Sequence, residues 1–267
     1  PRGVALNMSG QATAAMGIAT GDVTGDGIPD LFVTNYKGEA NCLYIQTEDG
    51  LFTDAISGTG LLQPTLEYIK WGTQFLDADN DGDLDLIIAN GHVGDFHLPN
   101  IECYMPTQLL QNRGGGTFVE ERAVAVGEYF ERKLLGRSVA LVDWNRDGRM
   151  DVVASSIAAP AAVLTNISPA AGSYLTLRLH AVKSARDAFG AQVIVTTDVG
   201  AFHQQLIAGG GYQASNERAL HFGLGQAARI EHVDVEWPSG ERDSYKAPEI
   251  NSATNLIEGR STSPTGN

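Results

Sequence analysis

A nine-residue acidic pattern occurs three times in the chain, and it constrains the fold more than any other feature. Each copy reads D-x-D/N/T-x-D-G-x-x-D, follows a short apolar stretch and opens a second apolar run. The copies begin at residues 22, 77 and 143, at intervals of 55 and 66 residues. Repeats of this length are typical of propeller blades or solenoid units. We refer to residues 22–30, 77–85 and 143–151 as the first, second and third loops.

The flanks of the loops repeat as well. Each loop lies between two predicted strands, and a third candidate strand follows. The third strands are 41–45, 108–112 and 162–165, and fourth strands follow at 50–54 and 116–120 in the first two units only. Four short antiparallel strands make up a propeller blade. We therefore predict an all-β fold, with a partial β-propeller of three four-stranded-type blades over residues 1–168.

The pattern changes after residue 168. Residues 169–260 alternate apolar and polar side chains between Gly, Pro, Asn or Asp turns, which predicts a β-sandwich. The predicted strands are 174–182, 191–197, 202–208, 220–223, 232–237 and 243–246. The small polar tail, 261–267, is predicted to be disordered.

The loops have the chemistry of a calcium site. A hard divalent cation takes six to eight oxygen ligands, which positions 1, 3, 5 and 9 supply from side chains and position 7 from its backbone carbonyl. Glycine at position 6 permits the tight turn. The predicted ligands, for up to three Ca²⁺ ions, are Asp22, Thr24, Asp26, Ile28 and Asp30; Asp77, Asp79, Asp81, Asp83 and Asp85; and Asp143, Asn145, Asp147, Arg149 and Asp151.

Two other interpretations of the loops are weaker. An EF-hand needs a glutamate at position 12 and flanking helices, but position 12 is Val33, Ile88 or Ala154, each within an apolar run. Solvated acidic turns would need three in-register copies by chance and would leave carboxylates repelling each other. Charge predicts that the second loop binds tightest, because Thr24 replaces an acid in the first loop and arginines flank the third.

The formal charge of −14 argues against a nucleic-acid partner, because phosphate binding needs basic patches. No apolar run approaches the roughly 18 residues of a membrane span, so membrane insertion is not expected. The two cysteines, Cys42 and Cys103, are interpreted as buried free thiols, with a single disulfide as the alternative.

Histidines mark two weaker candidate sites. His92, Asp95, His97 and Glu102 lie on an insertion in the second unit, which is interpreted as an ordinary surface loop, with a binding site or a catalytic metal as alternatives. On the predicted sandwich, His203, His221 and His232 are interpreted as isolated structural side chains, although they could converge.

The loops and their flanking strands resemble the FG-GAP or VCBS repeats of integrin-α-like β-propellers. The carboxy-terminal segment resembles the ASPIC/UnbV domain, and the pairing of the two is similar to the cartilage acidic protein family. The C-terminal resemblance rests on residues 175–179, 189–193, 209–212, 220–225 and 235–240. It implies a calcium-stabilised propeller, extracellular or periplasmic residence and a role in recognition. It also implies missing upstream blades, because propellers close with four to eight.

These features favour a secreted or periplasmic calcium-binding recognition or adhesion module with a protein or glycan ligand, and not an enzyme. No nucleophile-elbow or zinc-protease motif is present in the sequence, so no catalytic or cofactor-binding residue is assigned. The alternatives are a secreted polysaccharide-acting enzyme, with its site around His92, and a purely structural segment of a large surface protein.

Overall fold

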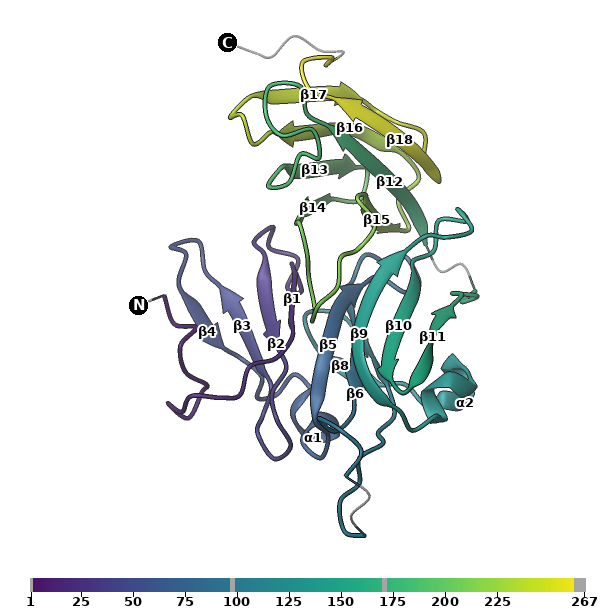
Figure 1. Ribbon diagram of the computed structural model, residues 1–267. Helices are drawn as coiled ribbons and strands as arrows, with labels where there is room; N and C mark the ends of the chain where they lie inside the picture. Colours follow the sequence, from purple (N-terminus) through teal and green to yellow (C-terminus); the bar gives the residue numbers. More distant parts are fainter. Residues whose placement is uncertain (1, 97–98, 170–171, 262–267) are drawn as a thin grey trace.

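The computed structural model describes residues 2–96, 99–169 and 172–261 and is all-β, built from five sheets. Figure 1 shows the first three sheets side by side and the last two above them, facing the upper ends of their strands. The first three sheets comprise β1 (Ile18–Gly21), β2 (Asp30–Val33), β3 (Cys42–Gln46) and β4 (Phe52–Asp54); β5 (Lys70–Leu76), β6 (Asp85–Asn90), β7 (Gln108–Asn112) and β8 (Phe118–Glu120); and β9 (Leu135–Val142), β10 (Asp151–Ile157) and β11 (Ala159–Leu164). Short helical turns occur at α1 (Leu62–Thr65), α2 (Ala123–Val126) and η1 (Glu128–Glu131).

Each of these three sheets is an up-and-down meander, as expected of a blade, with strands paired in chain order. The nine-residue loops join the first two strands of each sheet. The residue before each loop pairs with the aspartate at its ninth position, in the pairs Gly21–Asp30, Leu76–Asp85 and Val142–Asp151. The third sheet differs from the four-stranded type, since only three strands are found in its described part. After β11 the side chain of Asn166 donates to the carbonyl of Ala78 at 2.7 Å, which directs the chain toward the second loop.

Strand β6 is buried along its whole length because the middle sheet is covered on both faces. Its side chains alternate, as they must in a strand. Leu86 and Ile88 belong to a core shared with the first sheet, whereas Ile87 and Ala89 belong to a core shared with the third. One apolar strand therefore holds three sheets together.

The last two sheets pack around one hydrophobic core. They contain β12 (Ser173–His180), β15 (Leu220–Gly225) and β18 (Ser252–Ile257), and β14 (Ala201–Gln205), β13 (Gln192–Thr197), β16 (Ile230–Glu236) and β17 (Arg242–Lys246). Strand β18 was not predicted, because the run Ser252-Ala-Thr-Asn has little hydrophobic signal and only Leu256 of this strand is buried. It pairs parallel to β12. We call residues 172–261 the C-terminal domain, although the predicted boundaries at 168/169 and 260/261 stay predictions.

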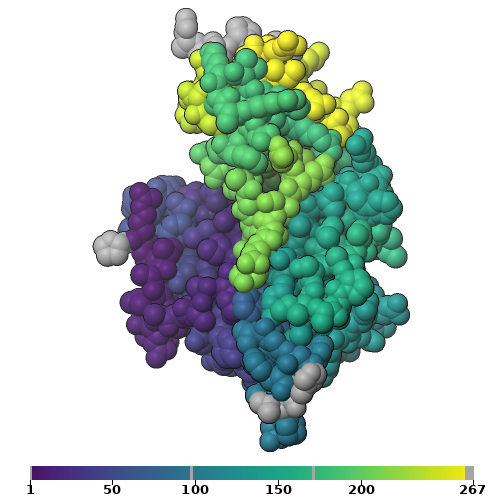
Figure 2. Space-filling model, viewed as in Figure 1, coloured from purple at the N-terminus to yellow at the C-terminus, as the bar shows by residue number. Residues whose placement is uncertain are grey.

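A hairpin of the C-terminal domain reaches back along the first strand of each of the first three sheets. Gly211 pairs with Ile18 of β1 through two backbone hydrogen bonds. Asn216 donates to Gln74 of β5 at 3.1 Å and accepts from the backbone of Leu141 of β9 at 2.9 Å. Figure 2 shows this segment, in lime, descending between the purple and teal parts of the surface. The hairpin fastens the C-terminal domain to all three sheets.

The structure bears on the predictions for the two cysteines and for membrane-spanning segments. Cys42 and Cys103 are free and buried, so the structure has no disulfide between them. Among the helices of the described ranges, none combines the length and the apolar character needed to span a bilayer.

Candidate metal loops and the domain interface

The three loops share one hydrogen-bond network, built on the aspartates at positions 1 and 5. The position-1 carboxylate accepts the backbone N–H groups of positions 5 and 6, and the position-5 carboxylate accepts that of position 7. These acceptors are Asp22 and Asp26, Asp77 and Asp81, and Asp143 and Asp147. The sequence repeat is therefore a repeat of local structure, in which carboxylates curl the backbone around a common centre.

Position 9 has a structural role that the metal pattern did not reveal. Asp30, Asp85 and Asp151 are almost completely buried, and each accepts two backbone N–H groups. One comes from position 2 of the loop, and the other comes from the end of the sheet's third strand or just after it, at Gln46, Asn112 or Asn166. Burial raises the pKa of Asp30 to about 6 and that of Asp85 to about 7. These carboxylates tie each loop to its own sheet.

Two positions in each loop have left-handed backbone. Gly27, Gly82 and Gly148 at position 6 have φ between 79° and 98°, in agreement with the predicted need for glycine. Position 4 has φ of 60–76° and carries Gly25, Asn80 and Arg146. The sequence did not predict this second position, because its residue type varies.

The second loop brings three carboxylates together. Oxygen atoms of Asp77, Asp79 and Asp81 lie within 4.8 Å of one another, and no other described residues form such a group. Gln111 donates to Asp79 Oδ2 at 2.9 Å, while the buried Asp79 Oδ1 has no hydrogen-bond partner among the described residues. Burial, followed by the charges of Asp81 and Asp85, raises the pKa of Asp77 to about 8. A partnerless buried oxygen beside mutually repelling carboxylates fits a hard cation.

The other two loops are less suited to a cation. In the third loop, Arg149 forms an ion pair with Asp147, and its Nε donates to the carbonyl of Asn166 at 3.0 Å. Asn145 also donates to Asp147 at 2.9 Å, so the position-5 carboxylate already has cationic and amide partners. In the first loop, Thr24 and Asp26 are exposed. Among the described residues, three predicted ligands of the second loop are therefore the ones whose carboxylate oxygens lie within 4.8 Å of one another.

The second loop also contacts the C-terminal domain, through Asn80. Its side chain donates to the Gly148 carbonyl of the third loop at 3.0 Å and lies 2.9 Å from His221 Nε2. Its carbonyl accepts the Gly225 N–H at 2.9 Å. Burial lowers the pKa of His221 to about 4, so this ring is neutral at pH 7. One residue thus links two loops and strand β15.

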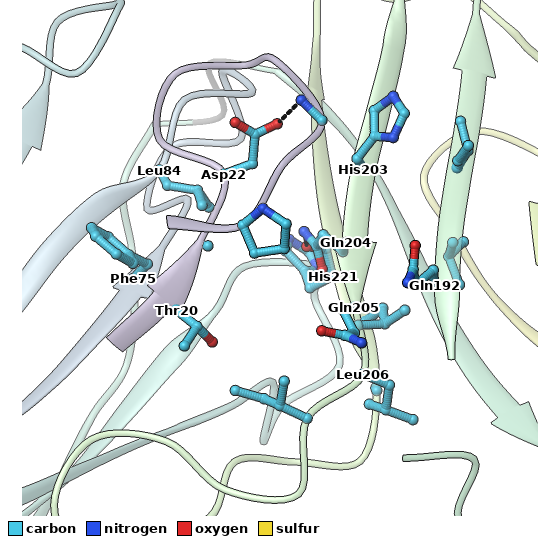
Figure 3. Close-up of a pocket in the computed structure, with 18 of the residues that line it drawn as sticks. Thr20, Asp22, Phe75, Leu84, Gln192, His203, Gln204, Gln205, Leu206 and His221 are labelled. Atoms are coloured by element: carbon cyan, nitrogen blue, oxygen red, sulfur yellow. Dashed lines mark hydrogen bonds between the residues drawn. The ribbon is translucent and has the colours of Figure 1, made fainter. Parts of the chain in front are cut away.

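A crevice of about 940 Å³ separates the first sheet from the C-terminal domain. Its lining includes Thr20 and Asp22 of the first unit, Phe75 and Leu84 of the second, and polar side chains of the β14-β13-β16-β17 sheet. Figure 3 shows His203 and His221 among its lining residues. His221 has structural partners, Thr176 Oγ1 at 3.1 Å and Asn80 Oδ1 at 2.9 Å, while the interpretation of the histidines as isolated stays a prediction. His232 is placed elsewhere, beside Asp234 at 3.2 Å.

The insertion around His92 forms no comparable carboxylate cluster within the described residues. His92 lies 3.4 Å from the Tyr36 hydroxyl and packs edge-on against Phe96. Tyr104 donates to Asp95 at 2.7 Å. Glu102 pairs with Lys133, and His97 lies outside the described residues.

Comparisons with known proteins identify both parts of the chain. The family model described as an FG-GAP-like repeat matches residues 22–88 and 77–154, and the model described as ASPIC and UnbV matches residues 181–263. Cartilage acidic protein 1 of Xenopus tropicalis is 25% identical over 91% of this chain and 45% of its own length. The human protein of that name is 23% identical over 92% of this chain and 44% of its own length.

The chain spans less than half the length of these relatives. The two family models fall on the loop-bearing sheets and on the C-terminal domain, respectively. The chain therefore combines FG-GAP-like repeats with an ASPIC and UnbV domain and is homologous to cartilage acidic protein 1.

Proposed function

We propose that this chain is a calcium-binding extracellular recognition module, in which cations in the acidic loops hold the surface that carries the C-terminal domain. The observation that carries the proposal is the second loop. It combines three converging carboxylates with a buried oxygen that has no partner among the described residues. Secretion and adhesion are proposed from the homology to cartilage acidic protein 1.

The residues that would hold the ion in the second loop are Asp77, Asp79 and Asp81, with the Asp83 carbonyl and Asp85 completing the predicted set. A bound divalent cation would supply positive charge to carboxylates that burial otherwise forces toward protonation. The loop's own hydrogen bonds fix Asp77 and Asp81, and Gln111 fixes Asp79. The chain thus preorganises the oxygens.

The first and third loops are proposed as weaker sites. The third has an internal cation in Arg149, and the first exposes its position-3 and position-5 side chains. Affinity in such loops follows ligand charge and site rigidity. The proposed order is therefore the second loop first, with the other two after it.

Calcium titration of the full chain by isothermal calorimetry tests this proposal. Asp79→Ala should abolish the tightest binding phase, because it removes the partnerless oxygen. Asp49→Ala is the matched control, since Asp49 is exposed and lies outside the loops. A chain that binds no calcium, or a tightest phase that survives Asp79→Ala, would refute the proposal.

A protein or glycan ligand is proposed for the module, and no catalytic residue is assigned. For the alternative of a polysaccharide-acting enzyme, the described side chains around His92 provide ring contacts and separate ion or hydrogen-bond pairs, and not two facing carboxyls.

A further inference from the structure

We propose that the crevice between the first sheet and the C-terminal domain binds a neutral oligosaccharide. This inference rests on the proposed recognition function and names its site and ligand class. The crevice volume of about 940 Å³ lies within the range of small-molecule sites, about 300–1,000 Å³. The site extends beyond the metal loops but shares lining residues with two of them, Asp22 and Gly27 of the first loop and Asp77 of the second (Asp22 is labelled in Figure 3).

The polar side chains that line the crevice include a set that is not engaged elsewhere. Five of them make no side-chain hydrogen bond with any described residue. Thr20 and Gln46 belong to the first sheet, and Gln192, His203 and Ser244 belong to the C-terminal domain. Unengaged groups therefore face the crevice from both walls.

The chemistry of this set favours hydroxyl groups as partners. Hydroxyls and carboxamides each combine a donor with an acceptor, and an imidazole ring has two nitrogens that can pair with a hydroxyl. A sugar hydroxyl also donates and accepts, so it can pair with any of the five without a mismatch. The pattern is less suited to a carboxylate or phosphate, which only accepts, or to an ammonium group, which only donates.

The charges around the crevice favour a neutral ligand. The six lining acids all have partners within the protein. Glu236 and Glu217 form ion pairs with Arg242 and Arg178, each at 2.7 Å, and Asp234 lies 3.2 Å from the His232 ring. Asp243 accepts from Trp237 and Tyr245, and Asp22 and Asp77 accept backbone N–H groups of their own loops. A basic peptide would have to compete with these partners. A sulfated chain would meet an acidic protein, because the formal charge is −14.

Apolar side chains also line the crevice. Phe75 and Leu84 line the crevice on one side and Leu206 on the other, as Figure 3 shows. A pyranose ring presents hydroxyls at its edge and C–H groups on its faces, so a lining of polar and apolar side chains matches both. The strand register places polar side chains in two rows on this sheet: Gln205, Gln192 and Glu236 in one, and His203, Asp234 and Ser244 in another.

The test uses the full chain and fluorescently labelled neutral trisaccharides: cellotriose, maltotriose, mannotriose and N,N′,N″-triacetylchitotriose. Binding is measured by anisotropy in saturating calcium, with a heparin-derived tetrasaccharide as the anionic comparison. At least one neutral trisaccharide should bind saturably. The double variant Gln46→Ala/Gln192→Ala should weaken that binding about tenfold or more, since one amide is lost from each wall.

Gln11→Ala is the matched control, because Gln11 is exposed and does not line the crevice. Thermal unfolding confirms that the double variant folds. The inference is overturned if no neutral trisaccharide binds, if the double variant binds as well as the parent chain, or if only the heparin fragment binds. Calcium titration of the same preparations separates the two proposals: a chain that binds calcium but no neutral sugar refutes only the sugar site.

Discussion

The second loop and the C-terminal domain pack closely at Gly223 on β15. A Cβ atom placed there would overlap Asp77 Oδ2 and would come within 2.8 Å of Asn80 Cα. The backbone of Gly223 has no positive φ, so alanine is excluded by space and not by backbone strain. The substitution Gly223→Ala therefore acts on one contact, between a predicted calcium ligand and the neighbouring domain.

The expected cost of Gly223→Ala follows from overpacking, which typically destabilises a packed site by about 1–3 kcal/mol. Because the added methyl group meets Asp77, part of this cost should reach the calcium site. A loss of about 1.4 kcal/mol there corresponds to tenfold weaker binding. We expect weaker binding at the tightest calcium site and lower stability of the calcium-loaded chain.

Two assays separate these effects. Calcium calorimetry measures the affinity, and urea unfolding in saturating calcium measures the free energy of unfolding. Gly94→Ala is the control, since Gly94 also has no positive φ and its added Cβ would meet only Phe96, at 3.9 Å. If Gly223→Ala matched Gly94→Ala in both assays, the contact between Asp77 and β15 would have no energetic role.

Two further predictions concern charge in the loops. In chelator, Tm should fall as pH rises from about 4 to about 8, because burial raises the folded-state pKa of Asp77 to about 8 and of Asp85 to about 7, above the ordinary value of 3.8. The folded state is favoured while both carboxyls stay protonated. Saturating calcium should remove the fall in Tm with pH. A Tm that does not change with pH in chelator would contradict the prediction. Arg149→Gln should strengthen calcium binding at the third loop, since Asp147 loses its ion-pair partner. The affinity of the third loop is measured by calorimetry in an Asp79→Ala background, with Arg113→Gln, outside the third loop, as the control. An unchanged third-loop affinity in Arg149→Gln would show that Arg149 does not compete with the ion.

The sequence predicted most of what is local. The repeated loops identified the first two strands of each sheet, and the glycine at position 6 has the positive φ that the turn requires. The all-β class followed from the same pattern. The role of Asp30 and its counterparts was missed, because a carboxylate that binds backbone looks the same in a sequence as one that binds metal.

The arrangement between the domains could not be predicted. The crevice exists because the C-terminal domain docks on the first three sheets, and a strand pattern carries no information about docking. The residues Gly209–Tyr212 supported the family resemblance, but their position beside β1 depends on contacts made far along the chain.

The hairpin that reaches back to β1 has a consequence for how the chain is made. Strand β1 lies at the edge of its sheet, and the backbone groups of Ile18 on that edge are paired by Gly211. Synthesis proceeds from the N-terminus at about 5–20 residues per second, so β1 waits roughly 10–40 s for its partner. During that time its open edge is available to other strands, including those of neighbouring nascent chains. A chain truncated before the hairpin would leave the backbone groups of Ile18 on this edge without their partner Gly211.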